Sequence, residues 1–239
     1  MQSRAIHRFA QARKRLQSEE RKRKERMTNK SERQALFDRW AATYSQAVTD
    51  EQFPFIGYEQ TLDALIQLGD FEAGQSVLDL GVGTGNLLLK LDIPQEQLWG
   101  VDFSAEMLAR AASALPGAHL HQVDLLAPRW PDEIGRRFDR IISGYTFHEF
   151  TDEDKLAILA RLAENHLTET GEILIADISF KSRADFEAGY QRFRDGWDEE
   201  EYYWCAEVVL PRIASLGLDG QYAQTSECAG IYRIQRVGD

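Results

Sequence analysis

Three closely spaced glycines and a distant acid form the pattern in this chain best suited to binding a ligand. The stretch SVLDLGVGTGN, residues 76–86, begins as an apolar run and continues through Gly81, Gly83 and Gly85. Asp102 follows Gly81 by twenty-one residues and ends the next apolar run. A strand that enters a glycine turn presents bare backbone, and a carboxylate at the end of the neighbouring strand can accept hydrogen bonds from a sugar. The pattern therefore predicts a site for a nucleoside-bearing cofactor.

The position of the third glycine separates two kinds of cofactor. Dinucleotide sites use G-x-G-x-x-G, but here the last position is Asn86 and Gly85 comes one residue early. Asp79 also precedes the turn, where a carboxylate would repel a pyrophosphate bound at a helix start. S-adenosylmethionine instead carries a cationic sulfonium and a free ammonium, both of which a carboxylate attracts. We therefore expect S-adenosylmethionine rather than NAD.

Later motifs resemble those of class I S-adenosylmethionine-dependent methyltransferases. DLGVGTG and VDFS look like the first two motifs of that family, VDLL at Val123–Leu126 resembles the third, and IISGYTFHEF at Ile141–Phe150 resembles the fourth. FDRWAATY at Phe37–Tyr44 is similar to the N-terminal lid segment of the small-molecule branch. The pattern is nearest to the YrrT-like group of bacterial methyltransferases, and it extends from Leu36 to the end of the chain.

The resemblance implies a cofactor-binding role for each motif residue. The turn of Gly81, Gly83 and Gly85 would lie under the methionine part of the cofactor, with Asp79 near its ammonium. Asp102 would accept hydrogen bonds from both ribose hydroxyls, because a carboxylate is only an acceptor. The remaining implied contacts are Phe103 and Met107 beside the adenine, Asp124 at its exocyclic amine, and Tyr44 in a lid, with Trp40 as a second lid candidate.

Structural roles compete with several of these assignments. The glycines could serve tight packing alone, although three at alternate positions favour a ligand. Asp102 could cap the next helix, where Ser104 competes for the same role. Asp124 could be a turn residue at a strand end. Trp40 and Tyr44 are one helical turn apart and could equally belong to a core.

His148 is the candidate catalytic residue. Methyl transfer from a sulfonium is an in-line displacement, so a protein base is needed only when the acceptor arrives protonated. His148 lies just beyond the fourth predicted strand, at the sheet edge where ligands bind in such folds. The alternative is that His148 only shapes the pocket or bonds the backbone. Glu149 stands where relatives carry a second histidine, which argues against a paired-histidine role.

Alternating strand and helix patterns predict the fold. The chain has 239 residues, of which 43% are hydrophobic, enough for one sizeable α/β domain. We expect a doubly wound, mostly parallel seven-stranded sheet that ends in an antiparallel hairpin, the Rossmann-like fold that the resemblance also implies. The expected strands cover residues 76–80, 98–102, 119–124, 140–143, 172–177, 221–225 and 230–236. The expected helices cover residues 57–68, 85–91, 105–115, the surroundings of Ile134, and 152–166.

The chain divides into an extension and a domain. Residues 1–30 form a basic N-terminal extension, either a solvated helix or a partly ordered arm, and Met27 could be the true start. Residues 31–239 form the methyltransferase domain, with a helical lid over 31–69 and a helical insert over about 181–216. The insert is expected to break around Gly196 and Pro211 and to cover the acceptor site.

The net charge of −11 is unevenly distributed. Residues 1–33 carry twelve Lys/Arg and four Asp/Glu, whereas the remainder carries sixteen against thirty-five. An acidic body repels phosphate backbones, so nucleic acid is expected to bind only through the basic tail. The primary prediction is transfer of a methyl group to a small-molecule acceptor. The alternatives are an RNA methyltransferase that uses the tail and a non-catalytic S-adenosylmethionine-binding module.

The remaining composition bounds location and assembly. The only two cysteines, Cys205 and Cys228, are not at metal-ligand spacing, which predicts no metal site and no disulfide. There is no run of eighteen or more apolar residues, so no membrane span is expected. These features favour a cytoplasmic protein. Its assembly, monomer or homodimer, is open.

Overall fold

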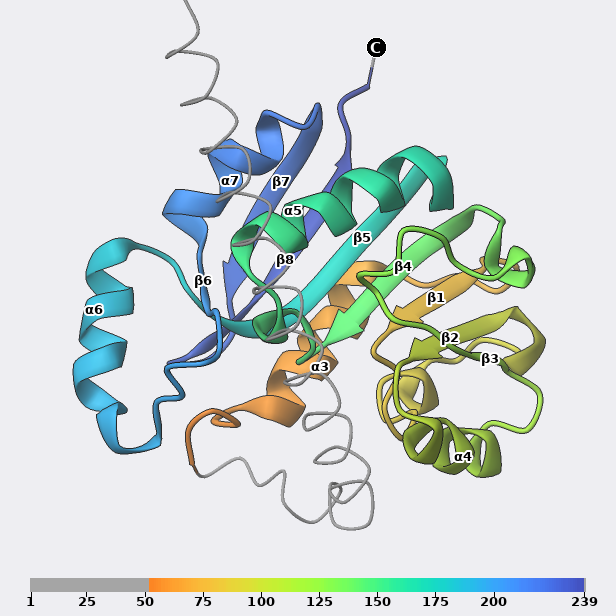
Figure 1. Cartoon of the computed structure of the whole chain (residues 1–239), viewed down its shortest axis with the longest axis horizontal. Helices are drawn as coiled ribbons and strands as arrows, with labels where there is room; N and C mark the ends of the chain where they lie inside the picture. Colours follow the sequence, from red (N-terminus) through yellow and green to blue (C-terminus); the bar gives the residue numbers. More distant parts are fainter. Residues whose placement is uncertain (1–51, 239) are drawn as a thin grey trace, which may run out of the picture.

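Seven strands lie side by side in the computed structural model, which describes residues 52–238. Their order is β3-β2-β1-β4-β5-β8-β7, and a short eighth strand, β6, pairs with the end of β5 off this path. The first five strands are parallel, and β8 runs antiparallel to both β5 and β7 (Figure 1). The predicted doubly wound sheet with a C-terminal antiparallel hairpin is therefore confirmed.

The elements alternate along the chain as the sequence indicates. The strands are β1 (Val77–Leu80), β2 (Leu98–Asp102), β3 (His119–Gln122), β4 (Phe138–Gly144), β5 (Leu167–Phe180), β6 (Trp204–Cys205), β7 (Leu218–Gln224) and β8 (Ala229–Arg236). The α-helices are α3 (Tyr58–Gly69), α4 (Ala105–Ala114), α5 (Asp152–Arg161), α6 (Arg183–Arg192) and α7 (Ala206–Ala214). Short turns of helix include η1 (Leu88–Lys90), η3 (Asp132–Ile134), η4 (Phe147–Glu149), the π-helix η5 (Leu162–His166) and η6 (Arg194–Gly196).

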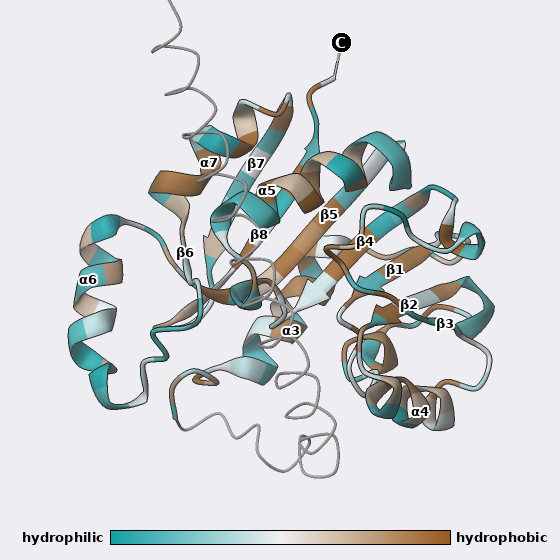
Figure 2. Ribbon diagram, in the orientation of Figure 1, coloured by the Kyte–Doolittle hydropathy of each residue, from teal (hydrophilic) through white to brown (hydrophobic). Residues whose placement is uncertain are grey.

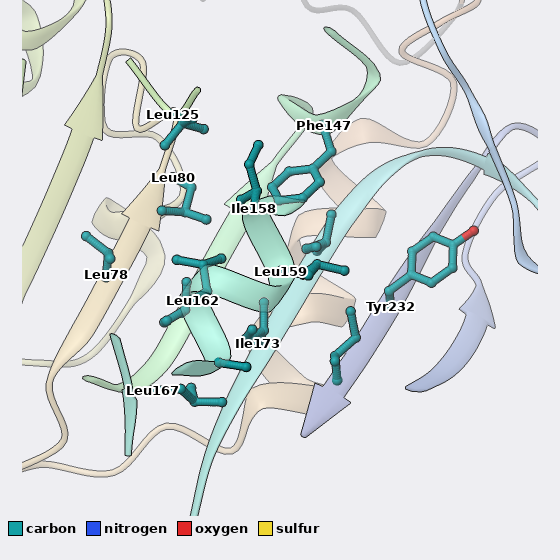
Figure 3. Close-up of a cluster of buried hydrophobic side chains, with 14 of the residues drawn as sticks. Leu78, Leu80, Leu125, Phe147, Ile158, Leu159, Leu162, Leu167, Ile173 and Tyr232 are labelled. Carbon is teal, nitrogen blue, oxygen red and sulfur yellow. The ribbon is translucent and has the colours of Figure 1, made fainter. Parts of the chain in front are cut away.

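Two apolar layers hold the sheet between its helices. Successive side chains of a strand point to opposite faces, so Val77 and Leu78 enter different layers. Figure 3 shows the layer under α5 and η5, in which Ile158 and Leu162 lie over strand residues such as Leu80. The opposite layer packs against α3. Because both faces are covered, the central strands are mostly apolar, as the brown middle part of β5 shows (Figure 2).

The predicted helix over residues 85–91 is wrong. Only the three-residue η1 forms there. Gly85 takes φ 90°, which is left-handed and cannot belong to a right-handed helix. Leu91 is already extended, and Ile93 precedes Pro94, which disfavours helical geometry before the proline. The segment is too short between these two constraints for an α-helix.

The insert after β5 differs from a broken helix. The expected break at Gly196 is confirmed, since η6 ends there. The break at Pro211 is wrong, because α7 runs through this proline and buries Val209 and Ile213. The strand β6 was not expected. In Figure 2, α6 is mostly hydrophilic, consistent with its many exposed side chains.

Several predictions fall outside residues 52–238. The basic extension and the lid residues Trp40 and Tyr44 are among them, so their assignments stay predictions.

Both cysteines are free thiols. Among the described helices, none is both long and apolar enough to cross a bilayer.

Candidate active site

The glycine turn forms a cleft at the carboxyl edge of the sheet. The arrowheads of β1, β2 and β4 point to this edge in Figure 1. Ligands of open parallel sheets bind at such edges, where the strand order reverses. Here β1 pairs with β2 on one side and β4 on the other. The cleft is lined by Tyr58, Leu62, Asp79, Gly81, Val82, Gly83, Thr84, Asn86, Leu87 and Gly144.

Glycine is needed at the three positions of the turn for different physical reasons. A Cβ atom at Gly81 would lie 2.2 Å from Oγ1 of Thr146, so packing leaves no room for a side chain there. A Cβ atom at Gly85 would lie 2.9 Å from Leu115 Cδ1, the end of a flexible side chain, so the left-handed φ of 90° is the stronger reason for glycine at this position. A Cβ at Gly83 would meet only the Gly81 carbonyl oxygen, at 4.0 Å. Gly83 takes φ 54° and faces the cleft, so it presents backbone to a ligand. Packing and ligand access thus act together in this turn.

Asp102 joins the glycine turn to the start of α4. Its Oδ2 accepts a hydrogen bond from the backbone N–H of Gly83 at 2.9 Å, and its Oδ1 accepts one from Ser104 N–H at 2.9 Å. The helix cap is Ser104, whose hydroxyl accepts from the Met107 N–H at 3.2 Å. The capping alternative for Asp102 is therefore excluded. Asp102 is left to shape the turn, with its carboxylate at the sheet edge.

Asp79 is a buried acid on the floor of the cleft. Its side chain belongs to β1 and the residue is only 1% exposed. Among the described residues, its Oδ1 has no hydrogen-bond partner. Burial, and then the negative charge of Asp102, raise the pKa of Asp79 well above its ordinary value. A buried carboxyl without a donor favours a cationic ligand in the cleft.

The residues assigned to the adenine lie beyond β2 and β3. Met107 is buried in the first turn of α4, and Phe103 is partly buried just before that helix. The backbone ties the two strand ends together, since Val123 N–H donates to the Asp102 carbonyl at 2.8 Å. Oδ1 of Asp124 accepts from Leu126 N–H at 3.0 Å, so the turn role of Asp124 is present. The proposed contacts with adenine stay predictions.

His148 stands on a rigid support beyond β4. Phe147 beside it is buried in the core, which fixes η4. Nδ1 of His148 lies 2.7 Å from Oδ1 of Asp177, near the end of β5, and its backbone N–H donates to Oδ2 at 2.9 Å. A carboxylate only accepts, so Nδ1 carries the proton of this bond and Nε2 points elsewhere. The alternative of a hydrogen bond from the ring to the backbone is not what the structure shows.

Two glutamates face the other ring nitrogen. Nε2 of His148 lies 3.7 Å from Oε1 of Glu149 and 3.9 Å from Oε1 of Glu201. Burial lowers the pKa of His148, but Asp177 and then the two glutamates outweigh it and raise the pKa to about 9. The acidic neighbours therefore favour the protonated imidazole, whereas a general base must be neutral. The catalytic role of His148 stays a prediction.

Hydrogen bonds hold the insert against the segment that carries His148. The Tyr202 N–H donates to the His148 carbonyl at 2.8 Å, and Nζ of Lys155 donates to the Tyr202 carbonyl. Lys155 is buried, and its ammonium lies 5.0 Å from the ring centroid of Trp204. Burial lowers the pKa of Lys155 to about 8, against the opposing pull of Asp177 and then Asp152. The segment predicted to cover the acceptor site thus contacts the candidate catalytic residue.

Sequence reasoning missed two partners of His148. Asp177 marked only the end of a predicted strand, and Glu201 lay within the predicted insert without a role of its own. One signal for Asp177 was available, because it ends an apolar run of residues as Asp102 does, although β5 itself continues to Phe180. No local signal distinguishes Glu201 from its acidic neighbours. Thr84, Asn86, Tyr58 and Leu62 also line the cleft without having been predicted.

Comparisons with known proteins agree with this geometry. A family model described as a methyltransferase domain matches residues 77–171. An uncharacterized methyltransferase of Geobacillus kaustophilus is 36% identical over 202 residues, which cover 79% of this chain and 90% of that protein. A DhpI–SAH complex superposes with a TM-score of 0.63 at 16% identity, covering 86% of this chain and 96% of that one.

A third protein, of known structure, has a similar fold. Magnesium protoporphyrin IX methyltransferase (ChlM) from Synechocystis PCC 6803, solved with bound SAH, has a TM-score of 0.60 at 18% identity. It covers 85% of this chain and 95% of that one. The family assignment itself rests on the Geobacillus relative, the domain match and the motifs around the glycine turn. This chain belongs to the class I S-adenosylmethionine-dependent methyltransferases.

Proposed function

We propose that this methyltransferase transfers a methyl group from S-adenosylmethionine to a small-molecule acceptor held between the glycine turn and the insert. The observation that supports the proposal is the hydrogen bond from Tyr202 N–H to the His148 carbonyl, which holds the insert against the segment that follows β4. The carboxylates of Glu149, Glu201 and Asp177 lie around the same histidine. An acidic acceptor site covered by the insert would suit a small molecule and repel the phosphates of RNA.

The residues at the sheet edge fit this cofactor. The unpartnered Oδ1 of Asp79 supports its pairing with an ammonium, and the open backbone at Gly83 supports close approach of the methionine part. Asp102 is proposed to take the ribose hydroxyls, with Phe103, Met107 and Asp124 toward the adenine. When bound, S-adenosylmethionine supplies an electrophilic methyl group on a sulfonium. The protein's part is then orientation of the two reactants and exclusion of water.

The proposal is tested by product formation. The purified chain is incubated with S-adenosylmethionine and fractionated metabolite pools, and release of S-adenosylhomocysteine is measured. We expect turnover with a low-molecular-weight fraction. We also expect the Asp102→Ala variant to lose most of its affinity for S-adenosylmethionine and S-adenosylhomocysteine. Turnover only with an RNA fraction would overturn the proposed acceptor class. If neither S-adenosylmethionine nor S-adenosylhomocysteine binds in calorimetry, the cofactor assignment is overturned.

Removal of residues 1–30 separates the alternatives further. An RNA methyltransferase that relies on the basic tail should lose salt-sensitive RNA binding together with its activity. A small-molecule enzyme should keep its turnover. A non-catalytic binding module would bind S-adenosylhomocysteine and yield no product with any fraction.

A further inference from the structure

Three potential ligand atoms converge beside the proposed acceptor site. They are Nε2 of His148 and one carboxylate oxygen each from Glu149 and Glu201, and all lie within 4.8 Å of one another. We propose that these three residues bind a divalent metal ion, although the sequence predicts no metal site. Binding of the ion does not depend on the proposed function, but a role of the ion in methyl transfer rests on that proposed function.

The spacing is too long for hydrogen bonds and approaches that of ligands around one ion. The distances from Nε2 to the two glutamate oxygens are 3.7 and 3.9 Å, beyond the range of N–H···O bonds. In residues 52–238 no hydrogen bond reaches Nε2. Two ligands about 2.1 Å from one ion stand at most about 4.2 Å apart, a limit that both distances from Nε2 satisfy. The three atoms together lie within 4.8 Å of one another, so the two glutamate oxygens would move closer together when the ion binds. One imidazole with two carboxylates suits Mn²⁺, Zn²⁺ or Fe²⁺.

Two of the three proposed ligands, His148 and Glu201, are oriented by hydrogen bonds from neighbouring groups, as metal ligands usually are. Asp177 accepts from Nδ1 of His148 at 2.7 Å and from two backbone N–H groups, which fixes the ring and directs Nε2 toward the glutamates. The Tyr203 hydroxyl donates to Oε2 of Glu201 at 2.7 Å, which leaves Oε1 directed at His148. A carboxylate behind a ligating histidine is a recurrent arrangement in metal sites.

The charges around the cluster favour a divalent cation. Three carboxylates, those of Asp177, Glu149 and Glu201, surround one imidazole, and Lys155 supplies one positive charge nearby. With a neutral imidazole these groups carry a net charge of −2, which a divalent ion balances. His148 is nine-tenths buried, so this charge is poorly screened by solvent.

Three protein ligands leave positions open on the ion. A structural ion is usually enclosed by four protein ligands, whereas three with an open position are typical of a catalytic site. The open positions would lie between the insert and η4, because Glu201 comes from the insert and His148 from η4. We therefore assign the acceptor to the class that offers an oxygen ligand, such as a hydroxyl or a carboxylate. A methyl acceptor bound in this way would be oriented by the ion.

Binding of Mn²⁺ provides the test. The chelator-treated full chain is titrated with Mn²⁺, and free Mn²⁺ is followed by electron paramagnetic resonance, with Zn²⁺ and Mg²⁺ as competitors. We expect one ion per chain, with affinity reduced at least tenfold in Glu201→Gln and by about 10- to 100-fold in Tyr203→Phe, which removes only the support of Glu201. Glu200→Gln is the matched control, because Glu200 is exposed in the same segment.

The outcomes separate this proposal from the proposed function. Retained Mn²⁺ binding in Glu200→Gln together with its loss in Glu201→Gln supports the site. Equal binding by all variants, or no binding by the wild type, overturns it. S-adenosylhomocysteine affinity is measured in parallel on each variant and on the metal-free protein. Normal nucleoside binding without Mn²⁺ binding would reject the metal site and leave the methyltransferase assignment intact.

Discussion

Replacement of Asp79 by asparagine should stabilise the ligand-free protein and weaken cofactor binding. Asp79 is 1% exposed, and among the described residues its Oδ1 has no hydrogen-bond partner. An unsatisfied neutral polar group costs about 1–3 kcal/mol when buried, and an unsatisfied charge costs more. At a pH above the raised pKa of Asp79, removal of the charge should therefore raise the free energy of unfolding by about 1 kcal/mol, which is about 2–4 °C in Tm for a chain of this size.

The pH dependence gives the sign of this effect. Burial and the charge of Asp102 raise the pKa of Asp79 in the folded state above its unfolded value. Between those two pKa values the folded protein holds more protons than the unfolded chain, so its stability falls as pH rises. Asp79→Asn lacks this loss. The stability advantage of the variant should be absent in acid, grow as pH rises through this window, and stay constant above it.

Cofactor binding should move in the opposite direction. Removing one partner of a buried charge pair costs about 2–5 kcal/mol, and tenfold corresponds to about 1.4 kcal/mol. The affinity for S-adenosylhomocysteine, which keeps the ammonium, should therefore fall by about 30-fold or more. Thermal unfolding across pH and calorimetry provide the two measurements, with the exposed Asp132→Asn as control. Wild-type affinity in Asp79→Asn, or a stability difference that does not change with pH, would refute this reasoning.

Four further substitutions test the elements that support the site. Gly81→Ala should lower Tm more than Gly83→Ala, because only the first Cβ collides with Thr146, whereas Gly83→Ala should mainly weaken S-adenosylhomocysteine binding in calorimetry. Thr151→Ala removes the cap of α5 and should cost about 1 kcal/mol of unfolding free energy, with unchanged nucleoside affinity. Lys155→Met should free the insert from α5, seen as faster hydrogen exchange in residues 198–205. Unchanged exchange there would show that Lys155 does not hold the insert.

The sheet could be predicted from sequence because its central strands are buried on both faces. Each central strand is an apolar run that ends where a polar residue or a turn begins, and β2 has the predicted bounds of residues 98–102. The helix at residues 85–91 failed for a local reason. Its apolar spacing suits a helix, but the turn needs the left-handed conformation of Gly85, which periodicity does not reveal.

The two halves of the site differ in how far the sequence reveals them. The glycine turn and Asp102 belong to one strand–turn–strand unit, so their spacing along the chain reflects their spacing in the fold. His148 meets Asp177 across 29 residues and Glu201 across a still longer separation, through an insert with its own packing. Only the pairing of β5 with β4 and β6 brings these side chains together. Residue spacing alone does not encode that juxtaposition.

Residues that oppose stability point to the function of this edge. Asp79, His148 and Lys155 are all buried ionisable residues whose pKa values depart from their ordinary ones. A core selected only for stability would carry apolar side chains at such positions, because buried charge is costly even when paired. Asp79 lies in β1 within the cleft, His148 in η4 beyond β4, and Lys155 near the start of α5. Among them Asp79, whose Oδ1 has no hydrogen-bond partner in the described residues, is where a cationic ligand would gain most, since an acid attracts an ammonium strongly only where water does not compete.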